Sequence, residues 1–264
     1  MGMTFETLSV ETPADHVLLI TLNRPEAANA FNTRMARDLI ALFEGVSLET
    51  GDIRAIVLTG AGDRAFCAGG DLKERDGMTD EAWGRQHLIY ERMVRAVLGC
   101  PVPTIGAING AAYGGGCELA AALDFCYAAE GAKFAQTEVR IGIIPGAGGT
   151  QTMARAIGER RAKEAILSAT PFTAAQALDW GLVNAVFPQD ALQPAALETA
   201  QKIAANAPIA TRQAKQAIHK GLQMGLSDGL AFEIEAYNRT IPTRDRREGV
   251  AAFNEKRPPR FEGR

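Results

Sequence analysis

The chain has 264 residues, of which 47% are hydrophobic and 22% are charged, and its formal net charge is -3. This composition is typical of an ordinary globular protein with a substantial core and gives no indication of nucleic-acid binding. The least polar long segment, residues 104–125, contains Asn109, Glu118, Asp124 and five glycines, which excludes a membrane span.

The spacing of the cysteines and histidines predicts neither a disulfide framework nor a metal site. The four cysteines, Cys67, Cys100, Cys117 and Cys126, have no CxxC spacing and stand among apolar residues, so we expect buried, reduced thiols. The three histidines lie far apart, and no metal site is expected. The N-terminal residues lack the pattern of a secretory signal, which favours a cytoplasmic or organelle-matrix location.

Strands and helices alternate in the first two thirds of the chain. Apolar, β-branched runs at 17–22 and 53–59 predict strands, and helical periodicity between them begins at Asn32. The pattern recurs as a helix at 80–98, a strand at 104–109, a short helix that begins in the glycines and ends at Leu123, and strands at 125–128, 133–136 and 182–187. This alternation predicts an α/β fold.

The pattern after Phe187 is purely helical. Four helices are expected, at 190–206, 208–223, 227–240 and 244–256. We therefore divide the chain into an α/β core at 1–195 and a helical C-terminal module at 196–264. Residues 239–264 carry a local excess of +4, which leaves -7 for the rest and offers a basic surface to an anionic ligand.

Three short motifs have simpler explanations than catalysis. Residues 60–65 match GxGxxA, but paired glycines follow where a dinucleotide-binding helix is required. Residues 225–229 match GxSxG between two helical patterns, so Ser227 is expected to cap a helix. Thr173 and Gln176 have the spacing of a capping box.

Two glycine-rich turns are candidates for a site that holds an oxyanion. One contains Gly69 and Gly70 and the other contains Gly114, Gly115 and Gly116. Glycine lets a backbone N–H approach a ligand without steric hindrance, and a helix start adds a favourable dipole. Two converging N–H donors would stabilise a developing negative charge on a carbonyl oxygen.

Two carboxylates stand beside these turns in apolar surroundings. Glu118 lies about one helical turn after Gly115, and Glu138 precedes another glycine-rich segment. Sheltered acids near an oxyanion hole indicate general acid–base chemistry on a carbonyl compound. Taken singly, Glu118 could instead be an acid stabilised by the helix dipole, and Glu138 could pair with Arg140.

The order of these motifs resembles the crotonase family of enoyl-CoA hydratases and isomerases from about Phe5 to Phe261. The motifs that carry the resemblance are Phe66-x-Ala68-Gly69-x-Asp71-Leu72, Ala107-Ile108-Asn109-Gly110-x-Ala112-x-Gly114-Gly115-Gly116-Cys117-Glu118-Leu119, and Ile144-Pro145-Gly146-Ala147-Gly148-Gly149-Thr150-Gln151. The resemblance implies a spiral of ββα repeats with a C-terminal helical module that assembles trimers or dimers of trimers.

The resemblance also implies roles for individual residues. Gly70 and Gly115 would form the oxyanion hole, Glu118 would activate water, and Glu138 would protonate Cα. The residues expected to bind coenzyme A or substrate are Ala68, Gly70, Asp71, Leu72, Lys73, Gly114 and, directly or across a subunit interface, Lys256. Coenzyme A is part of the substrate, so no separate cofactor is expected.

The implied activity is hydration of a trans-2-enoyl-CoA to a 3-hydroxyacyl-CoA, as in fatty-acid or related acyl-CoA degradation. The alternatives are a Δ3,Δ2-enoyl-CoA isomerase, another crotonase reaction, or a non-catalytic acyl-CoA- or RNA-binding member. The pair of acids favours hydration. Thr137 and Thr152 depart from the commonest residues at these positions, Pro and Arg, and bear on acyl-chain preference.

Overall fold

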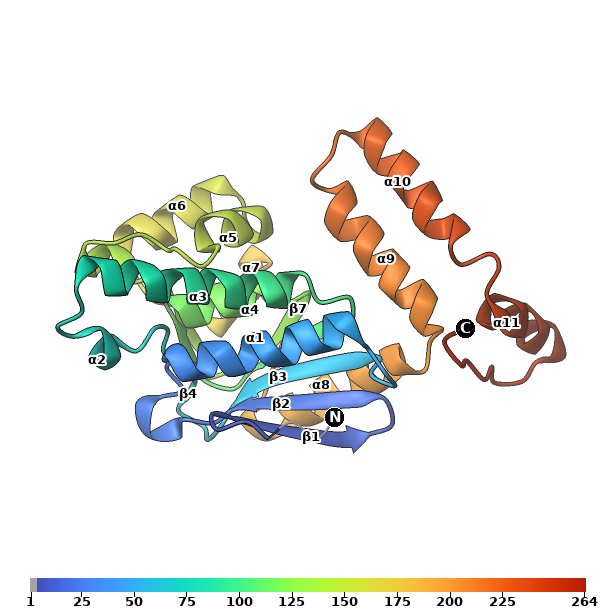
Figure 1. Ribbon diagram of the computed structural model, residues 1–264, viewed down its shortest axis with the longest axis horizontal. Helices are drawn as coiled ribbons and strands as arrows, with labels where there is room; N and C mark the ends of the chain where they lie inside the picture. Colours follow the sequence, from blue (N-terminus) through green and yellow to red (C-terminus); the bar gives the residue numbers. More distant parts are fainter. Residues whose placement is uncertain (1–3) are drawn as a thin grey trace.

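The computed structural model describes residues 4–264 and contains ten strands and eleven α-helices in that range (Figure 1). The strands are β1 (Leu8–Ala14), β2 (Val17–Leu22), β3 (Ala55–Gly60), β4 (Ala65–Cys67), β5 (Thr104–Ile108), β6 (Ala111–Tyr113), β7 (Phe125–Ala129), β8 (Lys133–Ala135), β9 (Phe172–Thr173) and β10 (Ala185–Phe187). The helices are α1 (Thr33–Leu48), α2 (Leu72–Arg75), α3 (Asp80–Leu98), α4 (Gly115–Ala122), α5 (Gly149–Ile157), α6 (Glu159–Ser168), α7 (Ala174–Trp180), α8 (Gln189–Ala204), α9 (Pro208–Gly221), α10 (Leu226–Asn238) and α11 (Arg244–Glu255), with short 3₁₀ turns η1 (Pro25–Ala27) and η2 (Glu138–Ile141).

The strands are divided between two sheets. The larger sheet has the order β1-β2-β3-β5-β7-β10 and the smaller has the order β4-β6-β8-β9. Neighbours are parallel except at β1 and β9, which run antiparallel to β2 and β8. Each of the pairs β3/β4, β5/β6 and β7/β8 supplies one strand to each sheet before helical structure follows, which is a ββα repeat.

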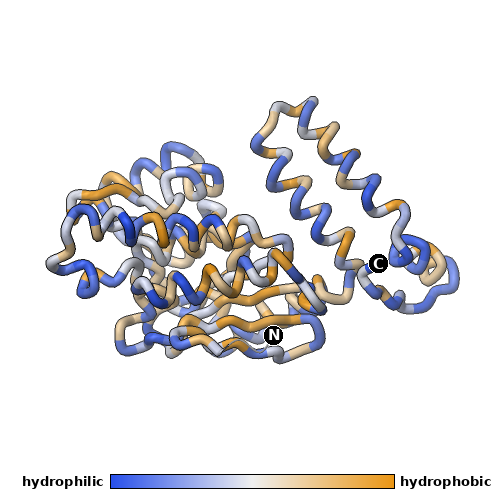
Figure 2. Tube along the Cα trace, in the orientation of Figure 1, coloured by the Kyte–Doolittle hydropathy of each residue, from blue (hydrophilic) through white to orange (hydrophobic). Residues whose placement is uncertain are grey.

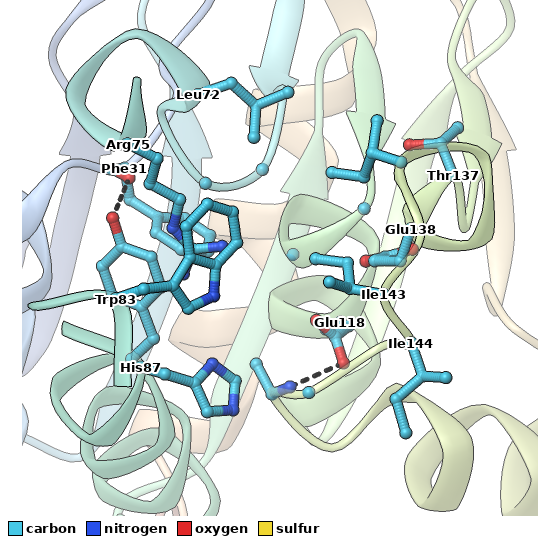
Figure 3. A pocket seen from close by; sticks show the side chains of 18 of the residues that line it. Phe31, Leu72, Arg75, Trp83, His87, Glu118, Thr137, Glu138, Ile143 and Ile144 are labelled. Carbon is cyan, nitrogen blue, oxygen red and sulfur yellow. Dashed lines mark hydrogen bonds between the residues drawn. The ribbon is translucent and has the colours of Figure 1, made fainter. Parts of the chain in front are cut away.

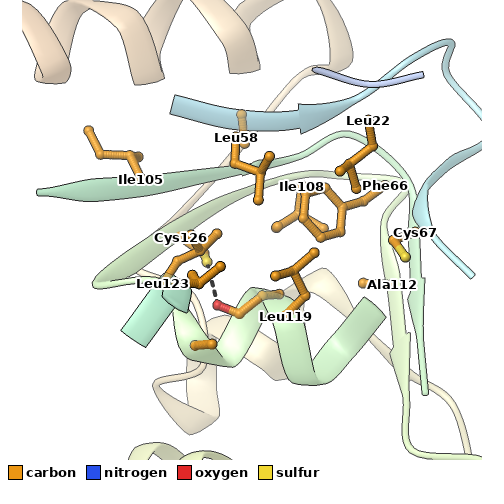
Figure 4. Packing of buried hydrophobic residues seen from close by; sticks show 14 of the residues in the cluster. Leu22, Leu58, Phe66, Cys67, Ile105, Ile108, Ala112, Leu119, Leu123 and Cys126 are labelled. Atoms are coloured by element: carbon orange, nitrogen blue, oxygen red, sulfur yellow. Dashed lines mark hydrogen bonds between the residues drawn. The ribbon is translucent and has the colours of Figure 1, made fainter. Parts of the chain in front are cut away.

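The core lies between the larger sheet and the helices that cover it. Helix α8 packs across β2, β3, β5, β7 and β10, while α1 and α3 run side by side above the sheet in Figure 1. Figure 4 shows Leu58 and Ile108 from the sheet packed near Leu119 of α4. Removal of such side chains from water is the main driving force for folding.

Several element boundaries follow from local chemistry that was visible in the sequence. Helix α3 has the predicted bounds, because Thr79 Oγ1 accepts a hydrogen bond from the Ala82 N–H (3.2 Å) and Gly99 ends the helix. Asn32 caps α1 in the same way through the Met35 N–H (2.9 Å). The capping box at Thr173 is confirmed.

Other parts of the prediction are wrong. Helix α10 begins at Leu226 with Gly225 at its N-cap, so Ser227 lies inside the helix and does not cap it. The last strand begins at Ala185 rather than at residue 182. The prediction lacked β1, β4, β6, β9, α2, α5 and α6, and of α7 it gave only the start, through the capping box at Thr173.

The last three helices form an arm that projects from the body (Figure 1). Helices α9 and α10 pack on each other, and Lys215 Nζ on α9 lies 2.7 Å from Asp124 Oδ2 of the body. The predicted division at residue 195 falls within α8, which packs on the core strands. Hydrophobic and hydrophilic residues alternate along α9 and α10 in Figure 2. Exposed large apolar side chains on this arm are Ile218, Leu222, Met224, Leu226, Leu230, Ile234, Tyr237, Ile241, Val250 and Phe253.

The structure bears on the state of the cysteines and on the lengths of the apolar helices. All four cysteines are buried and free, and burial raises the pKa of the Cys67 thiol to about 12. Among residues 4–264, no helix is both long and apolar enough to cross a membrane.

Candidate active site

A cavity of about 540 Å³ opens between two walls of the body (Figure 3). One wall is built by the turn after β4, by α2 and by α3, and the other by the start of α4, by η2 and by the loop that follows it. Its lining residues are Phe31, Ala68, Gly69, Gly70, Leu72, Arg75, Trp83, Gly84, His87, Tyr90, Gly114, Gly115, Glu118, Thr137, Glu138, Ile141, Ile143, Ile144, Gly146 and Ala147. A volume of this size accommodates a small organic ligand.

The two glycine-rich turns meet at one end of this cavity. Gly69 has a φ of +95°, and a Cβ atom built there would lie 2.8 Å from the Tyr113 carbonyl oxygen and 3.0 Å from the Gly115 nitrogen. Glycine is therefore required for the first turn to approach the second so closely. The sequence placed these turns together through their positions after two strands and through the family resemblance, which assigns Gly70 and Gly115 to one oxyanion hole.

The backbone N–H groups of Gly70 and Gly115 are available to a ligand. Phe31 pairs with the first turn by donating to the Gly69 carbonyl and accepting from the Asp71 N–H (2.9 and 3.0 Å). This pairing leaves the intervening Gly70 N–H outside the bridge. Within residues 4–264, neither the Gly70 nor the Gly115 N–H donates to a backbone oxygen, and both residues line the cavity.

A backbone contact fixes the start of α4 against β4. A Cβ atom at Gly116 would lie 2.0 Å from the Cys67 carbonyl oxygen, so no larger residue fits without main-chain movement. Gly115 is also confined, because its Cβ would lie 2.4 Å from Cζ of the buried Phe31 ring. The position of this helix start is thus determined by direct packing of main chain on main chain.

Glu118 is buried and held by a loop distant in sequence. Its side chain is 3% exposed, and Oε1 accepts hydrogen bonds from the Ala147 and Gly149 N–H groups at 2.8 and 2.7 Å. The pKa of Glu118 is raised to about 7, chiefly by burial and in addition by the nearby Glu138 carboxylate, while the two N–H donors act to lower it. A carboxyl group with this pKa can exchange a proton near neutral pH.

Glu138 faces the same cavity from the start of η2. Burial raises its pKa above the ordinary value. The fully buried Gln136 places one atom of its amide 3.1 Å from both carboxyl oxygens of Glu138. As an N–H₂ group this amide end would donate to the ionised carboxylate, and as a carbonyl it would accept the proton of the acid. The contact therefore suits both protonation states of Glu138.

The family is established by comparison with known proteins. A family model described as enoyl-CoA hydratase/isomerase matches residues 12–264. The chain belongs to this family. It is 47% identical over 249 residues to YngF of Bacillus subtilis, which covers 94% of this chain and 95% of that protein. It is 38% identical over 241 residues to the short-chain-enoyl-CoA hydratase of Clostridium acetobutylicum, with coverage of 91% and 92%.

A solved structure of an enoyl-CoA hydratase from Bacillus anthracis matches with a TM-score of 0.96 and 44% identity. The match covers 98% of this chain and 100% of that chain. The predicted crotonase-like α/β fold is therefore confirmed.

The helix dipole at Glu118 and an ion pair between Glu138 and Arg140 do not account for the positions of the two acids in this crotonase family member. Glu118 does lie in the first turn of α4, but its carboxylate is bonded by a separate loop and opens onto the cavity. Within residues 4–264, Arg140 forms no ion pair with Glu138. The structure thus brings both acids and both glycine N–H groups to one cavity.

The buried Glu118 is expected to affect the stability of this family member as well as its chemistry. Because its pKa in the folded state is about 7, against an ordinary 4.5, the folded state binds more protons between these values. Stability from this group is present at low pH and is lost as the pH rises toward 7. Glu118→Gln removes the titrating group and keeps an oxygen that accepts both N–H bonds. As the pH rises toward 7, the melting temperature of this variant should therefore fall less than that of the wild type.

Thermal unfolding of both proteins at about pH 5 and about pH 7.5 measures this difference. Parallel changes in melting temperature would contradict the raised pKa of Glu118.

Only some of the residues predicted to bind coenzyme A or substrate line the cavity. Ala68, Gly70, Leu72 and Gly114 line the cavity. Asp71, Lys73 and Lys256 do not.

Asp71 caps α2 through the Lys73 N–H (3.0 Å) and pairs with Arg24 (3.0 Å), so its carboxylate already has partners in the protein. Lys73 is exposed on α2. Lys256 follows α11 on the projecting arm, far from the cavity wall of the same chain (Figure 1). Its predicted role therefore requires a neighbouring subunit.

The segment 76–98 was expected to shape the pocket, but the individual residues of the wall formed by α2 and α3 were not identified from the sequence. Arg75, Trp83, His87 and Tyr90 line this wall. Figure 3 shows Arg75, Trp83 and His87 facing the two acids across the cavity. Trp83, His87 and Tyr90 recur at intervals of four and three residues, which is the spacing of one helix face. That periodicity was available in the sequence, but it did not indicate whether the face lined a cavity or packed in the core.

Proposed function

We propose that the protein is an enoyl-CoA hydratase that adds water across the double bond of a trans-2-enoyl-CoA to give a 3-hydroxyacyl-CoA. The observation that supports this most directly is that Glu118 and Glu138 open onto the same cavity as the Gly70 and Gly115 N–H groups. Hydration needs one group that activates water, a second that supplies a proton, and donors that stabilise the thioester oxygen.

The proposed reaction begins with the thioester oxygen held by the Gly70 and Gly115 N–H groups. Glu118 accepts a proton from water, and the water oxygen forms a bond to Cβ. The C=C electron pair moves toward the thioester, and the N–H donors stabilise the enolate charge. Glu138 then delivers its proton to Cα, so that the product gains one water in total. Dehydration uses the same groups in the opposite roles.

The environments of the two acids support this assignment. The Ala147 and Gly149 N–H groups stabilise the ionised form of Glu118, which suits a base. Burial favours the protonated form of Glu138, which suits an acid. Because burial also raises the Glu118 pKa to about 7, we expect the two groups to titrate as a coupled pair that carries one proton at the start of hydration.

The substrate and the assembly follow from the same proposal. Coenzyme A would enter as part of the substrate, with no separate cofactor. The exposed apolar side chains of the arm support assembly into a trimer or a dimer of trimers through α9–α11. The short-chain-enoyl-CoA hydratase among the relatives supports hydration as the reaction. We place this reaction in acyl-CoA degradation in the cytoplasm or an organelle matrix.

Incubation of the purified protein with short, medium and aryl trans-2-enoyl-CoA thioesters tests the proposal. We expect loss of the ultraviolet absorbance of the conjugated thioester and a product whose mass has increased by one water. A product of unchanged mass with a shifted double bond would indicate an isomerase. Binding of the thioesters without turnover would indicate a non-catalytic acyl-CoA-binding protein.

A further inference from the structure

Among residues 4–264, one cation in the cavity wall, Arg75, forms no ion pair. Arg75, at the end of α2, is only 8% exposed and lines the cavity between the glycine turn and α3 (Figure 3). Burial lowers the pKa of its guanidinium, although arginine remains charged at neutral pH. A buried charge is costly unless it is paired, so the absence of a partner calls for an explanation.

The contacts of Arg75 orient the guanidinium without neutralising it. Its Nε donates to Gln86 Oε1 at 2.7 Å, and its central carbon lies 4.2 Å from the centre of the Trp83 ring and 4.9 Å from that of Tyr90. Cation–π stacking of this kind holds the plane of the group in place. Within residues 4–264, no carboxylate oxygen lies within 4.0 Å of an Arg75 nitrogen.

The acid next to Arg75 in sequence is already engaged elsewhere. Glu74 Oε2 accepts hydrogen bonds from the Thr33 N–H and from Gln86 Nε2, both at 2.8 Å. Gln86 bonds to both side chains, so Glu74 acts on Arg75 only through an attraction that partly offsets the effect of burial. Among residues 4–264, the hydroxyl of Tyr90 also interacts with the guanidinium, and the remaining donors of the two terminal nitrogens are available to a group that enters the cavity.

The position of Arg75 favours the acyl end of the substrate over the coenzyme A end. A Cβ atom built on Gly70 would lie 3.9 Å from the guanidinium carbon. Gly70 is a proposed oxyanion donor, so Arg75 lies beside the place of the thioester and the first acyl carbons. The phosphates of coenzyme A are separated from the thioester by the long pantetheine chain and lie well beyond this distance.

Resting on the proposed function, we propose that Arg75 binds a second carboxylate, carried by the acyl group, so that the preferred substrates are 2-enoyl-CoA thioesters of dicarboxylic acids. The terminal guanidinium nitrogens can donate two parallel hydrogen bonds to such a carboxylate. Binding would supply the anion that the buried guanidinium lacks. The positive charge would also offset repulsion between that carboxylate and the acids on the opposite wall.

Matched pairs of thioesters test the proposal. The pairs are glutaconyl-CoA with pent-2-enoyl-CoA, and hex-2-enedioyl-CoA with hex-2-enoyl-CoA, which have equal chain lengths and differ in the terminal carboxylate. We expect the wild type to have a kcat/KM at least about 10-fold higher for one carboxylated member than for its neutral partner. Arg75→Met should lose about 100-fold on that substrate and change little on the neutral one, and Arg75→Lys should lie between them.

Equal losses on both members of a pair would overturn the proposal, since they would show that Arg75 supports the wall or the common coenzyme A portion. A wild-type preference for the neutral thioesters would overturn it as well. Melting temperatures of both variants show whether the fold is intact, and Arg75→Lys keeps the test valid if Arg75→Met is unstable.

A binding measurement separates this proposal from the hydratase assignment. Titration calorimetry compares glutaryl-CoA with pentanoyl-CoA, which are saturated and cannot be hydrated. If the wild type binds glutaryl-CoA more tightly than pentanoyl-CoA and Arg75→Met abolishes this difference, the role of Arg75 is supported even if no thioester is hydrated. Hydration with equal binding of the two analogues and no preference within the pairs would leave the hydratase assignment standing and overturn the role of Arg75.

Discussion

Glu118→Gln and Glu138→Gln should each lower the kcat of hydration by about 1,000-fold, because each variant removes one of the two proton-transferring groups. Glutamine keeps the size of the side chain and, at position 118, the oxygen that accepts the Ala147 and Gly149 N–H bonds. The cavity and the oxyanion donors should therefore be preserved. Initial rates over a range of substrate concentrations would show the loss in kcat rather than in KM.

Glu164→Gln provides a matched control, since Glu164 is an exposed acid on α6 outside the cavity. Its activity should equal that of the wild type. Full activity of Glu118→Gln would exclude Glu118 as the base that activates water. A loss confined to Glu138→Gln would favour a reaction that needs one acid, such as double-bond isomerisation.

Gly116→Ala should destabilise the fold by about 4 kcal/mol or more, among the largest effects of a single methyl group. The added Cβ would lie 2.0 Å from the Cys67 carbonyl oxygen, and main-chain atoms on both sides of the contact prevent a local adjustment. Relief requires α4 to move away from β4, which would also displace the neighbouring Gly115 N–H. Thermal or urea unfolding measures the loss, and a low yield of folded protein is the extreme form of the same result.

Gly84→Ala is the matched control for this effect. Gly84 lies inside α3, and a Cβ atom there would meet nothing within 4 Å. Alanine is favoured over glycine in a helix interior, so this variant should gain about 0.5–1 kcal/mol. Equal stability of the two variants would contradict the close packing assigned to Gly116.

The sequence predicted elements well where local signals and periodicity agreed. The bounds predicted for helix α3 agree with the structure, where Thr79 caps its start and Gly99 ends it. Strands β4 and β6 have three residues each, which is too short for an alternating pattern to emerge. Their pairing depends on residues far apart in sequence, so tertiary packing defines them.

The candidate site was predictable in part for a similar reason. Glycines at 70 and 115 and acids at 118 and 138 form motifs that resemble a known family, and the structure places all four at one cavity. Arg75 carries no such motif. Its proposed role rests on burial and on the lack of an ion pair within residues 4–264, neither of which can be known before α2 is placed against α3.

Because of the close packing at Gly116, the main-chain groups of the site and its side-chain groups should respond differently to mutation. The proposed oxyanion donors are main-chain atoms, and the contact of Gly116 with the Cys67 carbonyl holds the helix start that carries one of them, so we expect substitutions of cavity side chains other than Phe31 to leave it in place. The acids and the cation are side chains on different elements, α4, η2 and α2. Under the proposed function, we therefore expect point mutations to change the reaction or the acyl specificity while the groups that would activate the thioester stay in place.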